Sequence, residues 1–151
     1  LLSPIGVNWA KNFSKIVFLN PILDEGYIQE IKKVSGAEIY IPLDKKMNYK
    51  RFQDIDISRT NFGKIYSILS SKGELSSNSV FTLYDAFFAE SGVKFKDYFA
   101  ALCCFAELGI ITITMDEVFK VKPNRKVKRN LSESKIYNKL SLIKNVVKSE
   151  E

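Results

Sequence analysis

The side chains of this sequence that could carry chemistry gather in one stretch, residues 120–139. The stretch has one acid, Glu133, and a net charge of +7, whereas the whole chain has +6, so the remaining residues sum to about −1. Its eight basic residues are Lys120, Lys122, Arg125, Lys126, Lys128, Arg129, Lys135 and Lys139. Such a cluster is typical of a site for polyanions, because each phosphate that a cation neutralises releases condensed counterions.

The residues alone leave several roles open for this cluster. It could be a solvated loop that keeps the protein soluble, a contact for nucleic acid, or a docking site for an acidic protein. A membrane surface is disfavoured because no aromatic or amphipathic anchor flanks the cluster. Phe and Tyr are plentiful, and although most stand at helix-core spacing, a platform on which single-stranded bases stack is a further candidate.

Catalysis is weakly supported by the residue types present. The chain has no histidine, which excludes Ser–His and Cys–His nucleophile pairs and the commonest zinc sites. Cys103 and Cys104 are adjacent, so they lack a metal-ligand spacing and cannot form an ordinary disulfide with each other. Neighbouring carboxylates such as Asp54 and Asp56 fall in linker sequence. We therefore expect no catalytic residue, no metal site and no cofactor in this chain.

Length and composition indicate a folded, soluble protein. The chain has 151 residues, 46% of them hydrophobic, which suits one domain or two small ones. No apolar run approaches the roughly 20 residues that span a bilayer, and Leu1-Leu2 is too short for the core of a signal peptide. We expect a cytoplasmic location. The first residue is not Met, so we also expect a piece of a longer protein.

Residues 58–123 predict three helices and a hairpin. Apolar residues at three-and-four spacing predict helices over Arg59 to Lys72, over Val80 to Ser91 and from Phe95 to about Ala106. Ser58 and Ser79 are candidate N-caps. Gly73, Gly92 and Gly109 stand where a left-handed residue ends a helix, and Ser76-Ser77-Asn78 is expected to be a turn.

After Gly109 the apolar period changes from about 3.6 to 2. Ile111, Ile113, Phe119 and Val121 alternate with polar residues around a turn at Met115-Asp116-Glu117, which predicts a two-stranded ribbon. Three helices followed by a hairpin predict a winged-helix-like domain.

The N-terminal part predicts a different unit. Lys15 to Asn20 is a short apolar run typical of a strand buried on both faces, Asp24 to Val34 suits a helix, and Ala37 to Ile41 suits a second strand. Strand, helix and strand form one crossover unit of a parallel sheet, a Rossmann-like fragment. Two strands are too few for an independent sheet, so this unit needs a partner surface.

These segments give an α+β fold with two parts. Residues 1–45 form the βαβ crossover unit, residues 46–57 a linker, and residues 58–151 the winged-helix-like domain with its basic loop and C-terminal helix. That last helix begins near Ser132, and its expected apolar face is Ile136, Leu140, Ile143 and Val147.

The third predicted helix argues against a reader of base sequence. In a helix-turn-helix protein this helix would enter the major groove. Its expected exposed positions are Lys94, Lys96, Asp97, Cys104 and Glu107, which include no Arg, Asn or Gln to grip base edges. Contact with the nucleic-acid backbone fits better than readout of bases.

Four segments resemble a known family: Val17 to Pro21, Arg59 to Tyr66, Phe105 to Ile110, and Leu131 to Tyr137. They are similar to the C-terminal region of RecJ-type single-stranded-DNA-specific exonucleases, in the form found in Gram-positive bacteria. The resemblance covers nearly the whole chain from about residue 15.

The resemblance implies a parent enzyme of DNA repair and recombination that degrades single strands from the 5′ end. Divalent metal ions, Mn or Mg, held by Asp and His motifs, would belong to that parent. None of those motifs is in this sequence, so no catalytic residue is carried over. The resemblance implies a non-catalytic accessory domain whose partners are single-stranded DNA, the remainder of the exonuclease and, as a further candidate, single-strand-binding protein.

Overall fold

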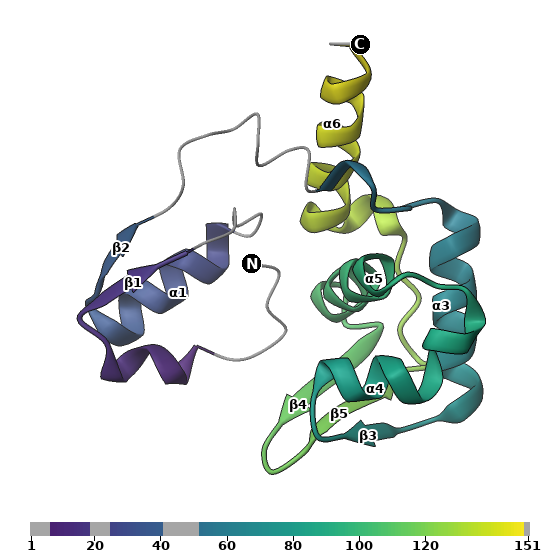
Figure 1. Cartoon of the computed structure of the whole chain (residues 1–151), viewed down its shortest axis with the longest axis horizontal. Helices are drawn as coiled ribbons and strands as arrows, with labels where there is room; N and C mark the ends of the chain where they lie inside the picture. Colours follow the sequence, from purple (N-terminus) through teal and green to yellow (C-terminus); the bar gives the residue numbers. More distant parts are fainter. Residues whose placement is uncertain (1–6, 19–24, 41–51, 150–151) are drawn as a thin grey trace. The chain divides into compact units, whose positions relative to one another are not determined.

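The protein has a mixed α+β fold in a computed structural model that describes residues 7–18, 25–40 and 52–149 (Figure 1). The chain divides into two compact units, Leu1–Asp54 with Lys139–Glu151, and Ile55–Asn138. Residues 46–51 of the predicted linker lie outside the described residues. The elements are η1 (Asn8–Asn12), β1 (Lys15–Val17), α1 (Glu25–Ser35), β2 (Glu38–Tyr40), α3 (Arg59–Lys72), β3 (Leu75–Ser77), α4 (Val80–Phe87), η2 (Ala89–Ser91), α5 (Phe95–Glu107), β4 (Ile111–Met115), β5 (Phe119–Pro123), η3 (Leu131–Glu133) and α6 (Lys135–Ser149).

The first unit contains the predicted strand, helix and strand. β1 and β2 pair in parallel, with Ile16 opposite Ile39, which confirms the crossover prediction. The start of the helix at Asp24 and the strand ends at Asn20 and Ile41 lie outside the described residues. Buried apolar side chains from η1, the strands and α1 make the core of this unit: Ala10, Ile16, Phe18, Tyr27, Ile31 and Ala37.

The prediction that β1 is buried on both faces was wrong. Ile16 and Phe18 are buried, but Val17 between them is 63% exposed, and Tyr40 on β2 is 51% exposed. Side chains alternate between the two faces of a strand, so one helix can cover only one face of this two-stranded sheet. Apolar residues at consecutive positions therefore did not indicate burial on both sides.

The second unit begins with α3, whose predicted bounds and cap are confirmed. The Ser58 hydroxyl accepts a hydrogen bond from the Asn61 amide at 3.2 Å. α4 begins at the predicted cap, because the Ser79 hydroxyl accepts from the Thr82 amide and the Thr82 hydroxyl accepts from the Ser79 amide. The predicted helix to Ser91 is divided, since α4 ends at Phe87 and η2 follows.

The glycines that follow the helices have positive φ, as expected. Gly92, at φ 80° and ψ 0°, is left-handed, a conformation that a side chain would strain. Gly73 also has a positive φ of 76°, but its ψ of −135° lies outside the left-handed helical region. The reason is that the chain leaves α3 directly into an extended segment, β3.

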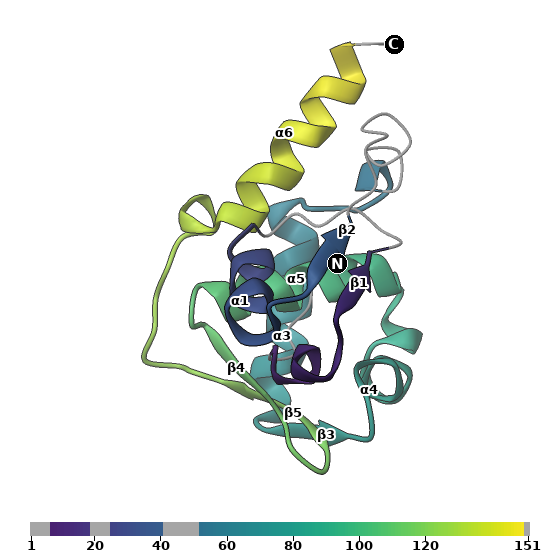
Figure 2. The ribbon, with the colours of Figure 1, turned by 90° about the vertical axis from the view of Figure 1, so that its left-hand side faces the viewer.

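The second unit contains an antiparallel sheet with strand order β3-β5-β4. The predicted ribbon is confirmed, with Ile113 paired to Val121. The turn predicted at Ser76-Ser77-Asn78 was wrong for its first two residues, because Leu75–Ser77 forms β3 and pairs with β5. In both views β3 runs beside α4, so the sheet and α4 pack together (Figures 1 and 2).

Helix α5 is the centre of the second unit. Tyr98 and Leu102 are fully buried and so is Cys104, which the sequence had placed on the exposed side of this helix. Asp97, also expected to be exposed, is 4% exposed. Its carboxylate accepts hydrogen bonds from the Asp56 amide at 2.9 Å and from the Asn61 side chain at 3.1 Å. A polar partner 36 or more residues away cannot be seen from helical periodicity.

The final helix, α6, begins at Lys135, directly after the buried Ser134. Ile136, Leu140 and Ile143 are buried as predicted, whereas the side chain of Val147 lies outside the described part of the structure. Among the described residues, no helix combines the length and the apolar character that crossing a bilayer requires.

We predict that Asp97→Ala lowers the free energy of unfolding by about 1–3 kcal/mol, because two donors lose their acceptor in a buried place. Urea unfolding followed by circular dichroism measures this change, and the Asp56 amide should lose protection from hydrogen exchange. Asp85→Ala, which removes an exposed carboxylate from α4, is the control and should change stability by less than about 0.5 kcal/mol. Equal effects of the two substitutions would contradict the assignment.

Candidate nucleic-acid interface

A groove of about 720 Å³ lies in the second unit, between α3 and the connection from β5 to η3. Figure 2 shows this connection as a long irregular segment. The groove is lined by Arg59, Phe62, Gly63, Tyr66, Phe105, Ile110, Arg125, Val127, Lys128, Arg129, Asn130 and Leu131. Of the cations predicted from the sequence, Arg125, Lys128 and Arg129 therefore meet here, together with Arg59 from α3.

The groove is strongly basic. Its four cations are all exposed, and none of the described residues that line it is acidic. Within the described part of the chain, neither the Arg59 guanidinium nor the Lys128 ammonium has an ion-pair or hydrogen-bond partner. Their charges are consequently available to an anion from solution.

The floor of the groove is aromatic. Phe62 and Phe105 are buried, and their rings meet edge to face at 5.8 Å. Tyr66, which is half-buried, makes the same kind of contact with Phe105 at 5.8 Å. Gly63 is exposed beside them, and a Cβ built on it would have no atom within 4 Å. The surface of α3 is thus open to a ligand along this line.

The position of Arg59 is electrostatically unfavourable for the helix that carries it. Arg59 is the first residue of α3, and no acid stands in the first turn of this helix. A cation at a helix N-terminus opposes the helix dipole, at a cost of about 0.3–1 kcal/mol. Arg59 therefore does not stabilise α3, which suggests that this side chain has a role in binding.

The basic connection is held against α3 at its start. The Asn124 amide donates to the Ile110 carbonyl at 2.8 Å, and the Val127 amide closes a turn onto the Asn124 carbonyl at 3.2 Å. The Arg125 guanidinium donates to the Ser70 carbonyl, in the last turn of α3, at 2.8 Å. Carbonyls at the end of a helix attract cations, so Arg125 serves as a tether as well as a charge.

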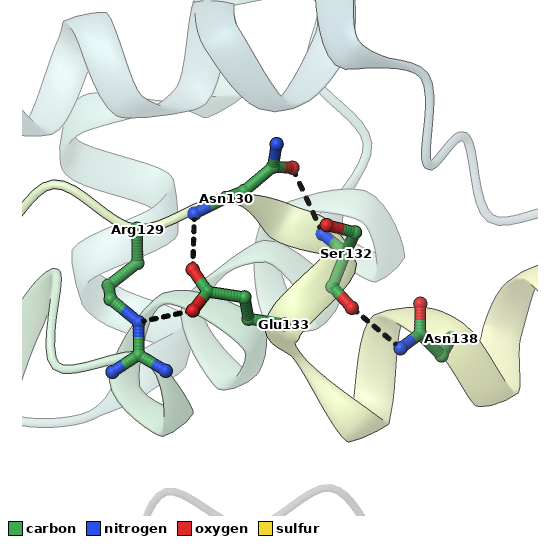
Figure 3. Close-up of polar contacts among 5 residues, drawn as sticks. All are labelled: Arg129, Asn130, Ser132, Glu133 and Asn138. Carbon is green, nitrogen blue, oxygen red and sulfur yellow. Dashed lines mark hydrogen bonds and ion pairs between the residues drawn. The ribbon is translucent and has the colours of Figure 1, made fainter.

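A second set of contacts orders the connection near Arg129 (Figure 3). The Asn130 amide donates to the Glu133 carboxylate at 2.8 Å, and the Asn130 side chain accepts from the Ser132 amide at 3.1 Å. The Arg129 guanidinium pairs with the same Glu133 carboxylate at 3.1 Å. Glu133 therefore offsets part of the charge of Arg129 and fixes its side chain at the rim of the groove.

The far end of the connection is held by Glu107 at the end of α5. Its carboxylate accepts from the Ser134 hydroxyl, from the Lys135 amide at 2.9 Å and from the Ile136 amide at 3.2 Å. These are free amides of the first turn of α6, so Glu107 acts as an N-cap supplied by another helix.

Burial raises the pKa of the nearby Cys104 thiol to about 12, which keeps it protonated at neutral pH.

The other predicted cations lie outside the groove lining. Lys120 and Lys122 alternate with the buried Phe119 and Val121 on β5, which puts them on the opposite face of the sheet. Lys126 is exposed in the connection, and Lys135 begins α6. Lys139 falls in the part of α6 that is grouped with the first unit.

Sequence reasoning missed Arg59 and Tyr66 as members of the site. Arg59, Gly63 and Tyr66 stand at i, i+4 and i+7, which puts them on one face of α3. An arginine in the first turn, where acids are favoured, was the signal that could have indicated this face.

Comparisons with protein families, with curated proteins and with solved structures found no match for this chain.

We predict that the Glu133 carboxyl titrates below its ordinary pKa. The Asn130 amide and the Arg129 guanidinium both stabilise the ionised form, which lowers the pKa. Since the folded pKa is depressed, these contacts contribute stability above the unfolded pKa of about 4.3 and lose it as the pH falls through the folded value.

Carbon-detected NMR of the Glu133 side chain measures this titration. Arg129→Gln is the matched variant and should move the midpoint part of the way back up, because the Asn130 amide remains. A midpoint at or above the ordinary glutamate value in the unaltered protein would contradict the contacts described for this connection.

Proposed function

We propose that this chain is a non-catalytic module that binds single-stranded nucleic acid without regard to sequence. The observation that carries the proposal is the groove beside α3, where four cations converge over an aromatic floor and none of the described lining residues is acidic. Proteins that hold single strands use such a charged groove for the phosphates and aromatic rings for the bases. Phe62 and Phe105 are buried beneath the groove, so the groove itself is assigned to the phosphates.

The order of elements supports a winged-helix-like assignment for the second unit. Three helices, α3, α4 and α5, precede the β4–β5 hairpin, and the short β3 between α3 and α4 joins this hairpin at β5. In such a fold α5 corresponds to the helix that reads bases and β4–β5 to the wing.

The surface of α5 favours binding without sequence readout. Of the side chains expected to be exposed on this helix, Asp97 and Cys104 are buried, and Glu107 is bound to the start of α6. Lys94 and Lys96 remain exposed. Ammonium groups act on phosphates as point charges, whereas base edges are gripped mostly by Arg, Asn and Gln.

The resemblance of four segments to RecJ-type exonucleases supports the proposal that the module belongs to an enzyme of that kind. In this proposal the parent enzyme supplies the metal-dependent cleavage of single strands, with Mn or Mg, and this chain adds a grip on the substrate. The remainder of the enzyme and single-stranded DNA are its partners. An acidic tail, such as that of single-strand-binding protein, is an alternative occupant of the groove because it carries the same sign of charge as phosphate.

A second role, docking on the nuclease core, is favoured by one observation in the first unit. Val17 and Tyr40 are 63% and 51% exposed on the uncovered face of the β1–β2 sheet. Two strands are marginal by themselves, so a surface that covers this face would stabilise the unit. The two roles use different units and are compatible.

Reversing the two unpartnered charges of the groove tests the proposal. Arg59→Glu with Lys128→Glu should weaken binding to a dT12 oligonucleotide, measured by fluorescence anisotropy over a salt series. The slope of log K against log salt should fall by roughly 1.4, from about 0.7 for each lost phosphate contact on a single strand. Arg59→Glu should also stabilise α3 by up to about 1 kcal/mol, because an acid suits its first turn.

The matched control is Lys11→Glu with Lys144→Glu, which makes the same change in net charge through two residues of the first unit. It should leave most of the affinity intact. Equal loss in the two double variants would show attraction by net charge alone and would contradict a site in the groove.

Blocking the groove without changing its charge is a separate test. Gly63→Leu adds a side chain where a Cβ meets no atom within 4 Å, so the fold should tolerate it. Stability should rise by roughly 0.5–1 kcal/mol, because leucine is the better helix former. Affinity for dT12 should fall, and a more stable variant with unchanged affinity would rule the groove out as the binding site.

A further inference from the structure

A ladder of three phenylalanine rings lies on the surface of the second unit, formed by Phe81 of α4 with Phe95 and Phe99 of α5. Phe81 is 62% exposed, whereas Leu83 and Phe88, which are close to it in sequence, are fully buried. A phenylalanine side chain that stays mostly exposed stabilises the fold less than a buried one, because less of its apolar surface is removed from water. The ladder therefore requires an explanation.

The rings of the ladder are stacked rather than packed edge to face. The Phe81 and Phe95 centroids are 5.0 Å apart with 12° between the ring planes, and Phe95 and Phe99 are 5.9 Å apart at 26°. Buried aromatic pairs elsewhere in the unit are edge to face or tilted, as Phe62 and Phe105 are at 73° and Phe88 and Tyr98 are at 44°. A parallel stack whose outermost ring is exposed is ready to be extended by another planar group.

The ladder is held rigidly. Tyr84 meets the edge of Phe95 at 5.3 Å and 88°, and its hydroxyl donates to the Val93 carbonyl at 2.6 Å. The Tyr98 hydroxyl donates to the Val80 carbonyl at 3.1 Å, which ties α5 to the start of α4. A ligand that stacks on Phe81 would therefore lose little binding free energy to the ordering of these side chains.

Charge near the ladder selects the kind of planar group. Lys94, which directly precedes Phe95 at the start of α5, is exposed. Asp85 stands one turn after Phe81 on α4, so an anion is expected to approach from the side of Lys94. Planar groups linked by anions are the chemistry of a nucleotide chain, whereas an apolar protein side chain or a second copy of this surface would make no use of Lys94.

We infer that Phe81, backed by Phe95 and Phe99, is a platform on which one base of a single strand stacks. This inference rests on the proposed function and adds to it the residue that makes binding selective for single strands over duplexes. The groove contacts phosphates, which single strands and duplexes share, while a base in a duplex is covered on both faces by its neighbours. The preference for single strands consequently resides at Phe81.

The test uses the full chain and three 12-nucleotide probes: dT12, an abasic strand with the same phosphates, and a duplex. Phe81→Ala should bind dT12 roughly 5- to 150-fold more weakly, the usual range for one lost stack, with the abasic strand and duplex unchanged. Phe81→Leu keeps an apolar side chain but loses the flat ring, so it should lose as much as Phe81→Ala. Circular dichroism checks that both variants fold.

A spectroscopic variant reports the stack itself. Phe81→Trp in a Trp9→Phe background leaves one tryptophan, whose fluorescence dT12 should quench and the abasic strand should not. Full affinity of Phe81→Ala for dT12, full affinity of Phe81→Leu alone, or no quenching would overturn the platform while leaving the groove in place. Failure of the unaltered chain to bind any probe at low salt would overturn the proposed function and the platform with it. Loss of a dimer in Phe81→Ala would instead assign the ladder to self-association.

Discussion

The candidate site depends on the anchoring of one segment, the connection from β5 to η3 together with η3 itself, which leads into α6. This segment brings Arg125, Lys128 and Arg129 next to Arg59, and like charges that close to one another repel. Hydrogen bonds at both ends offset that repulsion. The Asn124 amide donates to the Ile110 carbonyl at the start, and the Glu107 carboxylate accepts from the first turn of α6 at the end. Without these hydrogen bonds the connection would not be held beside α3, and the groove between them would not form.

Helix α3 joins this segment to the core because one of its faces packs into the unit and another lines the groove. Phe62, Ile65 and Leu69 are buried and hold the helix in the second unit. Arg59, Gly63 and Tyr66 lie on the groove side, and Ser70 receives the tether from Arg125. Arg59 and Gly63 on the groove side are exposed, so substitutions at these two positions should leave the core intact.

Periodicity predicted those parts of the fold that depend on local sequence. The helix bounds at Arg59 and Lys72, the caps at Ser58 and Ser79, and the alternating ribbon all follow from neighbours within one turn or one strand. β3 was missed because three residues, of which two are serine, carry no alternation to detect. Its strand character comes from pairing with β5, more than 40 residues away.

The candidate site was predicted in part for the same reason. The basic residues were visible by composition, but which of them converge is decided by tertiary contacts. Lys120 and Lys122 are turned away by the alternation of β5, whereas Arg59 is brought in from a helix that begins 66 residues before Arg125. Glu107 is exposed as expected, but its role as a cap of α6, through a contact that spans 28 residues, was not visible in the sequence.

Occupation of the groove beside α3 by single strands is measured directly by NMR of the ¹⁵N-labelled chain during addition of dT12. The largest shifts should fall on the amides of Gly63, Val127 and Lys128 and on the side-chain Nε of Arg59. Shifts confined to the first unit, with these four signals unmoved at saturation, would contradict binding in the groove.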